Sequence, residues 1–375
     1  MTYKYVATCL FGLESFLGEE IDALGCKRTE TIDGRVYFEG DIAASAKANM
    51  WLRTAERVYL LLGSFPAPDF DALFEGTRRI PLEDYIGKTD AFTVSGHSIK
   101  STLTSIPACQ KIIKKAMARR LGDAYGVTWL EESGTKYQTE FFILKDRADI
   151  MLDLSGVALH KRGYRPQSSE APLRETLAAA LVKTARPRED VLFWDPMCGS
   201  GTIPTEAALI MTNTAPGLFR SFDGEKFPFI DKNVWRDARE EAKASVKKTR
   251  FEAYASDIDP DCVEIAKKTV RNAGMESTVK VFRRNALEIT TEGRRGTIVC
   301  NPPYGERLLD VKEAEKLYCE MGRHFRTLEP WQIYVITNNE SFERFYGRRA
   351  DKKRKLYNGM IPCIYYQFFK KRDEK

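Results

Sequence analysis

Short apolar runs alternate with amphipathic segments over the second half of the chain. The apolar runs at 191–194, 253–256, 277–282, 297–300 and 332–337 are typical of buried strands, and the segments at 202–211, 234–248, 260 onward and 314–328 have helical spacing. Alternating strands and helices favour a mostly parallel sheet covered on both faces. The final pattern differs, because 353–357 and 361–369 flank the turn-forming pair Asn358-Gly359 and predict an antiparallel hairpin.

The first 155 residues have another pattern. Apolar strands are expected at 5–8 and 36–39 with helices at 13–24 and 42–49, followed by strands at 91–96, 141–144 and 149–154 and a helix at 107–121. This order predicts a small α+β region. The expected division is an N-terminal region at 1–155, a linker at 156–170 and a catalytic domain at 171–375. A chain of 375 residues is long enough for two or more such domains.

A glycine-rich turn joins the run at 191–194 to the helix beginning near Thr202. Its sequence is Asp195-Pro196-Met197-Cys198-Gly199-Ser200-Gly201-Thr202. Glycines at such a crossing let the backbone approach a ligand, which the N–H groups of the helix start then face. A dinucleotide fingerprint is excluded because Pro204 stands where its third glycine would be, and the Gly-Lys-Ser/Thr of a P-loop is absent.

Polar residues follow the next two expected strands. Asp257 ends the run at 253–256 and is the candidate for holding ribose hydroxyls, as acidic residues do at this place in Rossmann-like sites. Asp259 precedes Pro260 and is expected to cap a helix. The distance from the glycine turn to Asp257 exceeds a minimal βαβ unit, so an insertion is expected at about 212–232. Its phenylalanines are interpreted as packing residues.

The tetrapeptide Asn301-Pro302-Pro303-Tyr304 follows the apolar run at 297–300. The side-chain oxygen of Asn301 and the carbonyl of Pro302 can each accept a proton from an exocyclic amine, the prolines stiffen the loop, and the Tyr304 ring can stack on a base. An ordinary turn after a strand remains the alternative for an isolated match of this kind.

Taken together, these motifs resemble the catalytic domain of THUMP-containing RNA guanine-N2 methyltransferases, the family of the bacterial 23S rRNA enzyme and its archaeal tRNA relatives. The resemblance rests on the glycine turn, on the tetrapeptide continuing as Gly305-Glu306-Arg307-Leu308, and on the stretches at 163–167 and 171–181. It implies a class I Rossmann-like methyltransferase fold, α/β with a mostly parallel sheet and a terminal antiparallel hairpin, preceded by an α+β ferredoxin-like and THUMP region that binds RNA. The stretch at 171–181 is expected to be a helix that helps to close the cofactor pocket.

The resemblance also assigns roles to residues. S-adenosylmethionine (SAM) is the implied cofactor, and the implied catalytic residues are Asn301, Pro302, Pro303 and Tyr304. The implied cofactor-binding residues are Asp195, Met197, Cys198, Gly199, Gly201, Thr202, Asp257, Ile258, Asn285 and Ala286, with Asn285 at the adenine and Asp195 ordering the loop. The expected activity is methylation of guanine N2 in RNA, with rRNA favoured and tRNA open. The alternatives are adenine-N6 methylation of DNA or RNA, because adenine also offers an exocyclic amine, and a non-catalytic RNA-binding assembly factor.

RNA contacts are expected on the helix at 107–121, where basic residues cover the side opposite its apolar face. These residues are Lys111, Lys114, Lys115 and Arg119, and Arg307 is a further candidate near the tetrapeptide. Such side chains supply sequence-independent affinity for phosphates, although a merely solvated basic face is the alternative. A formal net charge of +6 is compatible with this partner.

The remaining composition excludes several classes of protein. No apolar run approaches the roughly 18 residues of a membrane span, and the first 18 residues lack the apolar core of a cleavable signal. The eight cysteines form no Cys-x-x-Cys pair, so neither a zinc site nor a disulfide framework is expected. The expected location is the cytoplasm.

Overall fold

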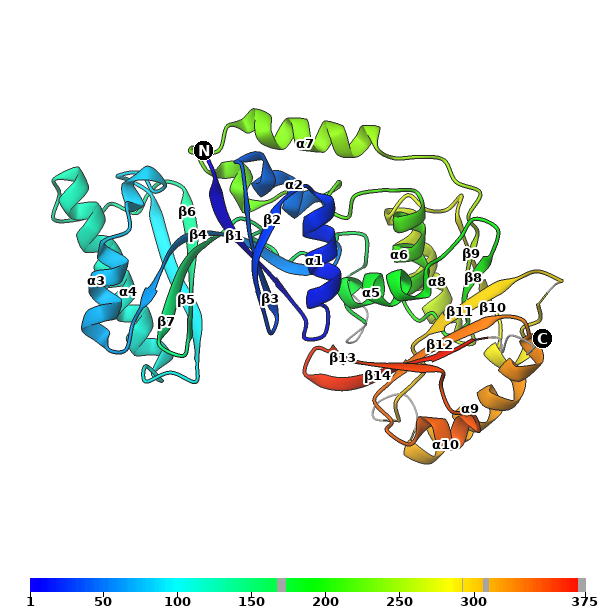
Figure 1. Ribbon diagram of the computed structural model, residues 1–375. Coiled ribbons are helices and arrows are strands. Elements are labelled where there is room, and N and C mark those ends of the chain that lie inside the picture. The colour runs from blue at the N-terminus through cyan, green and yellow to red at the C-terminus, as the bar shows by residue number, and fades with distance from the viewer. Residues whose placement is uncertain (167–172, 292, 306–309, 370–375) are drawn as a thin grey trace.

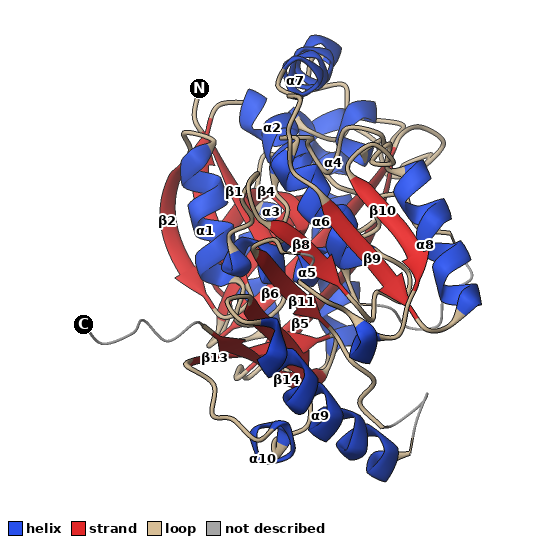
Figure 2. Ribbon diagram, turned by 90° about the vertical axis from the view of Figure 1, so that its right-hand side faces the viewer, coloured by secondary structure: helices blue, strands red, loops and turns tan. Residues whose placement is uncertain are grey.

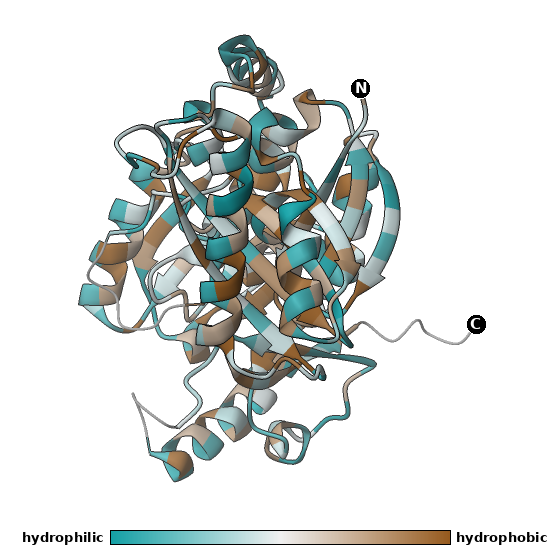
Figure 3. Cartoon of the chain, turned by 90° about the vertical axis from the view of Figure 1, so that its left-hand side faces the viewer, coloured by the Kyte–Doolittle hydropathy of each residue, from teal (hydrophilic) through white to brown (hydrophobic). Residues whose placement is uncertain are grey.

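The computed structural model describes residues 1–166, 173–291, 293–305 and 310–369. Two seven-stranded sheets form the frame of the molecule, one in each half of the chain (Figure 1). Each sheet has its own hydrophobic clusters, and Figure 3 shows hydrophobic colours along the strands and polar colours on many outward helix faces. The apolar runs in the two halves of the sequence thus correspond to two sheets, each packed against helices.

The N-terminal sheet has the strand order β2-β3-β1-β4-β7-β6-β5. All neighbouring strands are antiparallel except β5 and β6. Its strands are β1 (Tyr3–Cys9), β2 (Lys27–Ile32), β3 (Arg35–Gly40), β4 (Ala55–Pro66), β5 (Ala91–Ile99), β6 (Lys136–Leu144) and β7 (Arg147–Asp153), and its helices are α1 (Glu14–Ala23), α2 (Ala43–Trp51), α3 (Phe70–Arg78) and α4 (Ile106–Tyr125), with the short 3-10 turn η1 (Leu82–Asp84). The expected α+β region is therefore present, and its strands form one continuous sheet.

The C-terminal sheet has the order β10-β9-β8-β11-β12-β14-β13. Strands β10, β9, β8, β11 and β12 run parallel, whereas β14 pairs antiparallel with β12 and with β13. The strands are β8 (Leu192–Asp195), β9 (Ala253–Asp257), β10 (Val279–Arg283), β11 (Gly296–Cys300), β12 (Gln332–Thr337), β13 (Lys352–Asn358) and β14 (Ile361–Phe368). The predicted parallel sheet with a terminal hairpin is confirmed.

Helices cover both faces of this sheet (Figure 2). They are α5 (Glu175–Ala185), α6 (Thr202–Met211), α8 (Pro260–Asn272), α9 (Val311–Phe325) and α10 (Phe342–Tyr346), with the 3-10 turns η3 (Ala286–Glu288) and η4 (Arg326–Leu328). Successive residues of β8 point to opposite faces. Phe193 therefore joins the cluster containing α5, α6 and α8, while Trp194 joins the cluster containing α9 and α10.

The expected insertion contributes to the core of the other half of the molecule. It contains the 3-10 turn η2 (Asp223–Lys226) and leads into α7 (Lys232–Ala244), which lies against α2. Phe222 stacks on Trp235 with ring centroids 5.4 Å apart, and Phe227 stacks on Tyr137 of β6 at 4.4 Å. Phe222 and Phe227 are buried in the N-terminal cluster, so their interpretation as packing residues agrees with the structure, although Phe219 is 72% exposed.

Several helix predictions were wrong in their bounds: α4 runs on to Tyr125, beyond the expected 107–121, and α9 begins at Val311, before the expected 314. The helix expected at 171–181 begins only at Glu175, because Arg174 has an extended backbone; residues 171 and 172 lie outside the described residues. The helix expected at 234–248 is α7, which begins at Lys232 because Asp231 caps it through the N–H of Asn233, and which ends at Ala244.

Candidate active site at the carboxyl edge of the catalytic sheet

The candidate site lies where the strand order of the catalytic sheet reverses. Strands β8, β9 and β10 follow one another outward on one side of β8, whereas β11 and β12 follow on the other. Open α/β sheets bind ligands at the carboxyl ends of the strands at such a switch point. Asp195, Asp257 and Asn301 stand at or just after the carboxyl ends of the three strands nearest to this point.

The glycine turn after β8 has left-handed backbone at both of its glycines. The φ angle is +50° at Gly199 and +74° at Gly201, a region that residues with a side chain rarely adopt. A Cβ atom at Gly199 would meet nothing within 4 Å, so this glycine faces open space, whereas one at Gly201 would lie 3.1 Å from the side chain of Ala266 in α8. Gly199 therefore leaves room for a ligand, and Gly201 permits close packing of two helices.

Hydrogen bonds and burial fix the rest of this turn. Asp195 is 1% exposed and accepts a hydrogen bond from the N–H of Met197 at 3.2 Å. Burial, with the nearby charge of Asp257, raises the pKa of Asp195 well above its usual range. Burial likewise raises the pKa of the Cys198 thiol, which suits a pocket-lining residue and not a nucleophile. The hydroxyls of Ser200 and Thr202 are 3.0 Å apart at the start of α6.

Asp257 ties the end of β9 to the glycine turn. Its Oδ2 accepts from the N–H of Gly199 at 2.9 Å, and its Oδ1 accepts from the N–H of Asp259 at 3.1 Å. Burial raises the pKa of Asp257. Ile258, the next residue, is 59% exposed beside this turn. Asp259 caps α8 through the N–H of Asp261, as expected from Pro260 at the helix start.

Asn285 and Ala286 follow β10 on the outer side of Asp257. The side-chain oxygen of Asn285 accepts from the N–H of Leu287 at 3.0 Å, which makes Asn285 the cap of η3. Ala286 is buried. The peptide N–H of Arg284 donates to the carbonyl of Asp257 at 3.0 Å, so the segments after β9 and β10 are joined.

The tetrapeptide after β11 carries an unpaired acceptor. Oδ1 of Asn301 is buried and has no hydrogen-bond partner among the described residues. A buried oxygen without a partner is costly, which indicates a group that a ligand satisfies. Pro302 is buried, and the Tyr318 hydroxyl donates to the carbonyl of Pro303 at 2.7 Å. The Tyr304 hydroxyl lies 3.6 Å from Sγ of Cys363 in β14.

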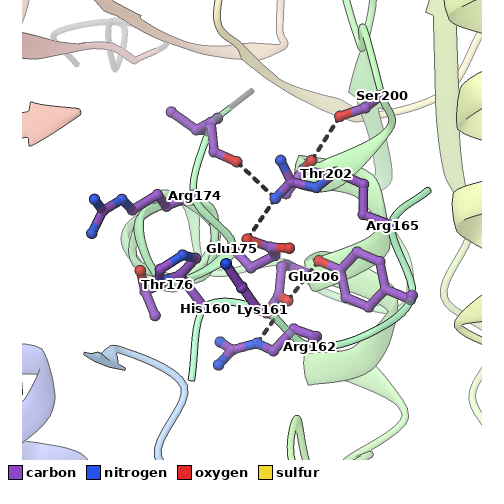
Figure 4. Close-up of polar contacts among 12 residues, drawn as sticks. His160, Lys161, Arg162, Arg165, Arg174, Glu175, Thr176, Ser200, Thr202 and Glu206 are labelled. Atoms are coloured by element: carbon purple, nitrogen blue, oxygen red, sulfur yellow. Dashed lines mark hydrogen bonds and ion pairs between the residues drawn. The ribbon is translucent and has the colours of Figure 1, made fainter. Parts of the chain in front are cut away.

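Figure 4 shows a polar cluster beside the glycine turn that was not predicted from the sequence. Arg165 pairs with Glu175 at the start of α5 at 2.5 Å. Arg162 pairs with the buried carboxylate of Glu206 in α6 at 3.4 Å, and the Tyr164 hydroxyl donates to the same carboxylate at 2.9 Å. The sequence feature that could have indicated this cluster is Glu206, the one charged residue of α6.

The basic residues of α4 that were expected to bind RNA are not at this site. Lys111, Lys114, Lys115 and Arg119 are exposed on α4, which lies at the other end of the molecule from β8 (Figure 1). Arg307 lies outside the described residues. The expected contacts on α4 therefore form a surface separate from the tetrapeptide.

The described residues fit SAM as a cofactor. The open space at Gly199, the exposed side chain of Ile258 and the carboxylate of Asp257 lie at the same strand ends. Within the described ranges, no cluster of three or more His, Cys, Asp and Glu side chains could hold a metal ion. Nor does any helix in the described part of the chain have the length and apolar character needed to cross a membrane.

Comparison with known proteins agrees with this geometry. Family models match residues 162–367 as an RMKL-like methyltransferase domain, residues 4–59 as an RlmL ferredoxin-like domain and residues 67–153 as a THUMP domain. The chain is 45% identical to the protein named putative RNA methyltransferase YpsC of Bacillus subtilis (strain 168), over 98% of this chain and 96% of that protein.

A second relative is the ribosomal RNA large subunit methyltransferase K/L of Hahella chejuensis (strain KCTC 2396). It is 33% identical over 98% of this chain but only 53% of its own length, so the chain spans about half of this relative. The solved structure of SMU.472, complexed with SAH, superposes with a TM-score of 0.92 and 39% identity, covering 100% of this chain and 99% of that one.

The switch-point sheet, the glycine turn, the acid after β9 and the Asn-Pro-Pro-Tyr loop define a class I, SAM-dependent methyltransferase. Within that class, the chain belongs to the RMKL-like methyltransferase family, with an RlmL-type ferredoxin-like domain and a THUMP domain at its N-terminus. The fold class, the cofactor and the family expected from the sequence are thereby confirmed.

Proposed function

We propose that this methyltransferase acts on RNA and transfers a methyl group to the exocyclic N2 of a guanine, in 23S rRNA. The observation that carries the proposal is the buried Oδ1 of Asn301, which has no hydrogen-bond partner in the part of the chain that the structure describes. It follows β11, the strand adjacent to β8 and its glycine turn. An amine proton satisfies this oxygen, and so the target nitrogen is held close to the cofactor position.

The other loop residues serve the same amine. The carbonyl of Pro302 accepts the second N–H, and the two acceptors favour a pyramidal nitrogen whose lone pair points at the methyl group. SAM supplies an electrophilic methyl on a sulfonium. As the new C–N bond forms, the C–S bond breaks, and the methylated nitrogen then loses a proton to solvent. A strong general base is not needed, because the nitrogen becomes acidic as it is alkylated.

The remaining residues have the following roles in this proposal. Gly199 leaves room for the cofactor, Gly201 lets the cofactor turn pack closely on α8, and Asp257 accepts from the ribose hydroxyls. Asn285 and Ala286 lie beside the adenine, and Tyr304 stacks on the target base once its ring leaves the β14 contact. The proposed division into an RNA-binding region at 1–155, a linker at 156–170 and a catalytic domain at 171–375 assigns substrate capture to the first and chemistry to the last.

RNA as the substrate is supported by the THUMP match and by the exposed lysines of α4. It is also supported by the relatives, because the K/L enzyme of Hahella chejuensis is named for the large-subunit rRNA. Guanine in tRNA and adenine N6 remain the alternatives that the same loop could serve, since each offers an exocyclic amine. We place the protein in the cytoplasm, where these RNAs are made.

Methyl transfer from labelled SAM tests the proposal. The acceptors are rRNA, tRNA and DNA from cells lacking the gene, and the products are identified by nucleoside mass spectrometry. N2-methylguanosine in 23S rRNA is the expected result. N6-methyladenine would overturn the base, and N2-methylguanosine confined to tRNA would overturn the RNA class. Measured SAM binding without transfer to any pool would favour a non-catalytic assembly factor.

A further inference from the structure

The hairpin of β13 and β14 reaches past the edge of the sheet at which Asn301 lies. Thr337, the last residue of β12, pairs with Ile364 of the antiparallel β14. The residues before Ile364, back to the turn at Asn358 and Gly359, therefore extend beyond the carboxyl end of the neighbouring strand. The Tyr304 hydroxyl contacts this extension, through Sγ of Cys363 at 3.6 Å and through the Asn358 side chain.

The N-terminal domain supports the hairpin from the other side. Arg354 of β13 donates to the carbonyl of Gly12 at 2.9 Å and to the Ser15 hydroxyl at 2.7 Å, and its guanidinium lies 4.2 Å from the centroid of the Phe16 ring. A Cβ atom at Gly12 would lie 2.9 Å from the carbonyl oxygen of Lys355, so the backbones of the loop before α1 and of β13 are in close contact. The hairpin is therefore held in a fixed position beside the tetrapeptide.

Apolar and basic side chains remain exposed at this junction. Phe11 is 53% exposed, and its ring meets the edge of Tyr357 with centroids 5.9 Å apart. Nζ of Lys355 lies 5.7 Å from the centroid of the Tyr357 ring. Met360, at the tip, is 94% exposed and so contributes almost nothing to packing within the chain. We call these four residues, Phe11, Tyr357, Lys355 and Met360, the tip platform.

Aromatic rings combined with lysines are the chemistry by which proteins bind single-stranded nucleic acid, since bases stack on the rings and phosphates meet the cations. A flipped target also leaves a gap in its strand that an apolar side chain can fill. We propose that the tip platform binds the unpaired nucleotides next to the target guanine, with Met360 occupying the space that the flipped base leaves. This inference rests on the proposed function and identifies the substrate as single-stranded RNA at the modified position.

Edge protection is the competing explanation for the basic residues of β13, because β13 is the outer strand of its sheet. That explanation accounts for Lys352 and Lys353, because charged side chains on an edge strand prevent it from pairing with another chain. It gives no reason for the exposed apolar side chains of Phe11 and Met360.

Direct contact is tested by photo-crosslinking. The full chain is mixed with rRNA transcribed with 4-thiouridine and irradiated, and crosslinked peptides are identified by mass spectrometry. Crosslinks to the peptides containing Phe11 and residues 357–360 are expected. Crosslinks confined to α4, with none at the tip, would overturn the proposal.

Kinetics tests the role of the platform. Met360→Ala and Phe11→Ala change exposed side chains, and Phe219→Ala, an exposed phenylalanine of the insertion, is the matched control. For each platform variant, kcat/KM for rRNA from cells lacking the gene is expected to fall by about tenfold, the order of a lost base stack, with an unchanged Kd for SAM. Values of kcat/KM for the platform variants that equal the value for Phe219→Ala would overturn the proposal. A wild-type protein that crosslinks through the tip but transfers no methyl group would instead overturn the proposed function.

Discussion

Gly199 and Asp257 are joined by a hydrogen bond in which the glycine N–H donates to Oδ2 of the carboxylate at 2.9 Å. The two residues are separated by 57 positions of intervening chain that include α6, the insertion and α7. The bond sets the glycine turn after β8 against the end of β9. One carboxylate therefore both shapes the cofactor turn and stands where ribose hydroxyls are held in Rossmann-like sites.

Asp257→Ala is expected to weaken SAM binding by about tenfold or more, because it removes a charged acceptor from the turn and from the ligand at once. Asp257→Asn, which keeps one side-chain oxygen, is expected to lose less of the affinity for SAM. Calorimetric titration with SAM measures both. An unchanged Kd for the alanine variant would show that neither the turn nor the ribose depends on this carboxylate.

Asn301→Ala is expected to lower the rate of methyl transfer by about 100-fold or more, the usual cost of removing a preorganised group that contacts the reacting atoms. The Kd for SAM should stay within about twofold, because Asn301 lies beyond the turn that holds the cofactor. Single-turnover transfer and calorimetry measure the two effects. Asn233→Ala, on the exposed side of α7, is the control, and near wild-type turnover of the Asn301 variant would refute its assigned role.

Part of the site was predictable from the sequence, namely the polar residues that directly follow a predicted strand. Asp195, Asp257 and Asn301 each follow a short apolar run, and the carboxyl ends of parallel strands share one edge of a sheet. The orientation of side chains was not predictable in the same way. Asn285 stands at the expected position, but its oxygen caps η3. The contact of Tyr304 with Cys363 depends on a pairing between distant strands.

Much of the fold was predictable, but two strands of the N-terminal sheet were missed, and one of them, β4, contains the apolar run at 58–62. Strand β2 was missed because it is mostly exposed and polar, so it shows no apolar alternation. Strand β4 was also missed; it joins the ferredoxin-like and THUMP segments into one sheet. The packing of Phe227 on Tyr137 could not be inferred, because nothing local shows which distant core a phenylalanine joins.

Glu206→Ala is expected to destabilise the protein by about 3–5 kcal/mol, since it leaves Arg162 as an uncompensated buried charge. Tyr164→Phe, which removes one hydrogen bond to Glu206, should cost about 1–2 kcal/mol. Replacing both charged partners, with Arg162→Met and Glu206→Leu together, should recover much of the loss. Urea unfolding of the three variants checks this, and a loss of less than about 1 kcal/mol in Glu206→Ala would contradict it.

Asp153 should make stability depend on pH. Burial raises its pKa from the ordinary value of 3.8 to about 6, although Arg57 and the N–H groups of Ser155 and Gly156 oppose this shift. Its contribution to stability is fully present below pH 3.8 and is lost as the pH rises through 6, by about 3 kcal/mol at most. The free energy of unfolding of Asp153→Asn, measured from pH 4 to 7.5, should therefore lack this decline. Parallel curves for variant and wild type would exclude the shift.

The lysines of α4 allow the RNA-binding surface to be tested charge by charge. Lys114 pairs with Glu132 at 3.4 Å and Arg119 with Asp123 at 3.1 Å. Among the described residues, no carboxylate forms an ion pair with Lys111 or Lys115, and both are exposed. A cation already paired with an acid gains less from a phosphate, so these two lysines should contribute most of the salt-sensitive affinity.

The double variant Lys111→Ala with Lys115→Ala is therefore expected to bind RNA more weakly and to depend less on salt. Its plot of log K against log salt concentration should be less steep by about 0.7 to 0.9 per lysine. Fluorescence anisotropy with labelled rRNA fragments gives both values. The pair Lys232→Ala and Lys248→Ala removes the same charge from exposed positions elsewhere and should leave the slope nearly unchanged. Equal slopes for the two double variants would mean that net charge, and not the face of α4, attracts the RNA.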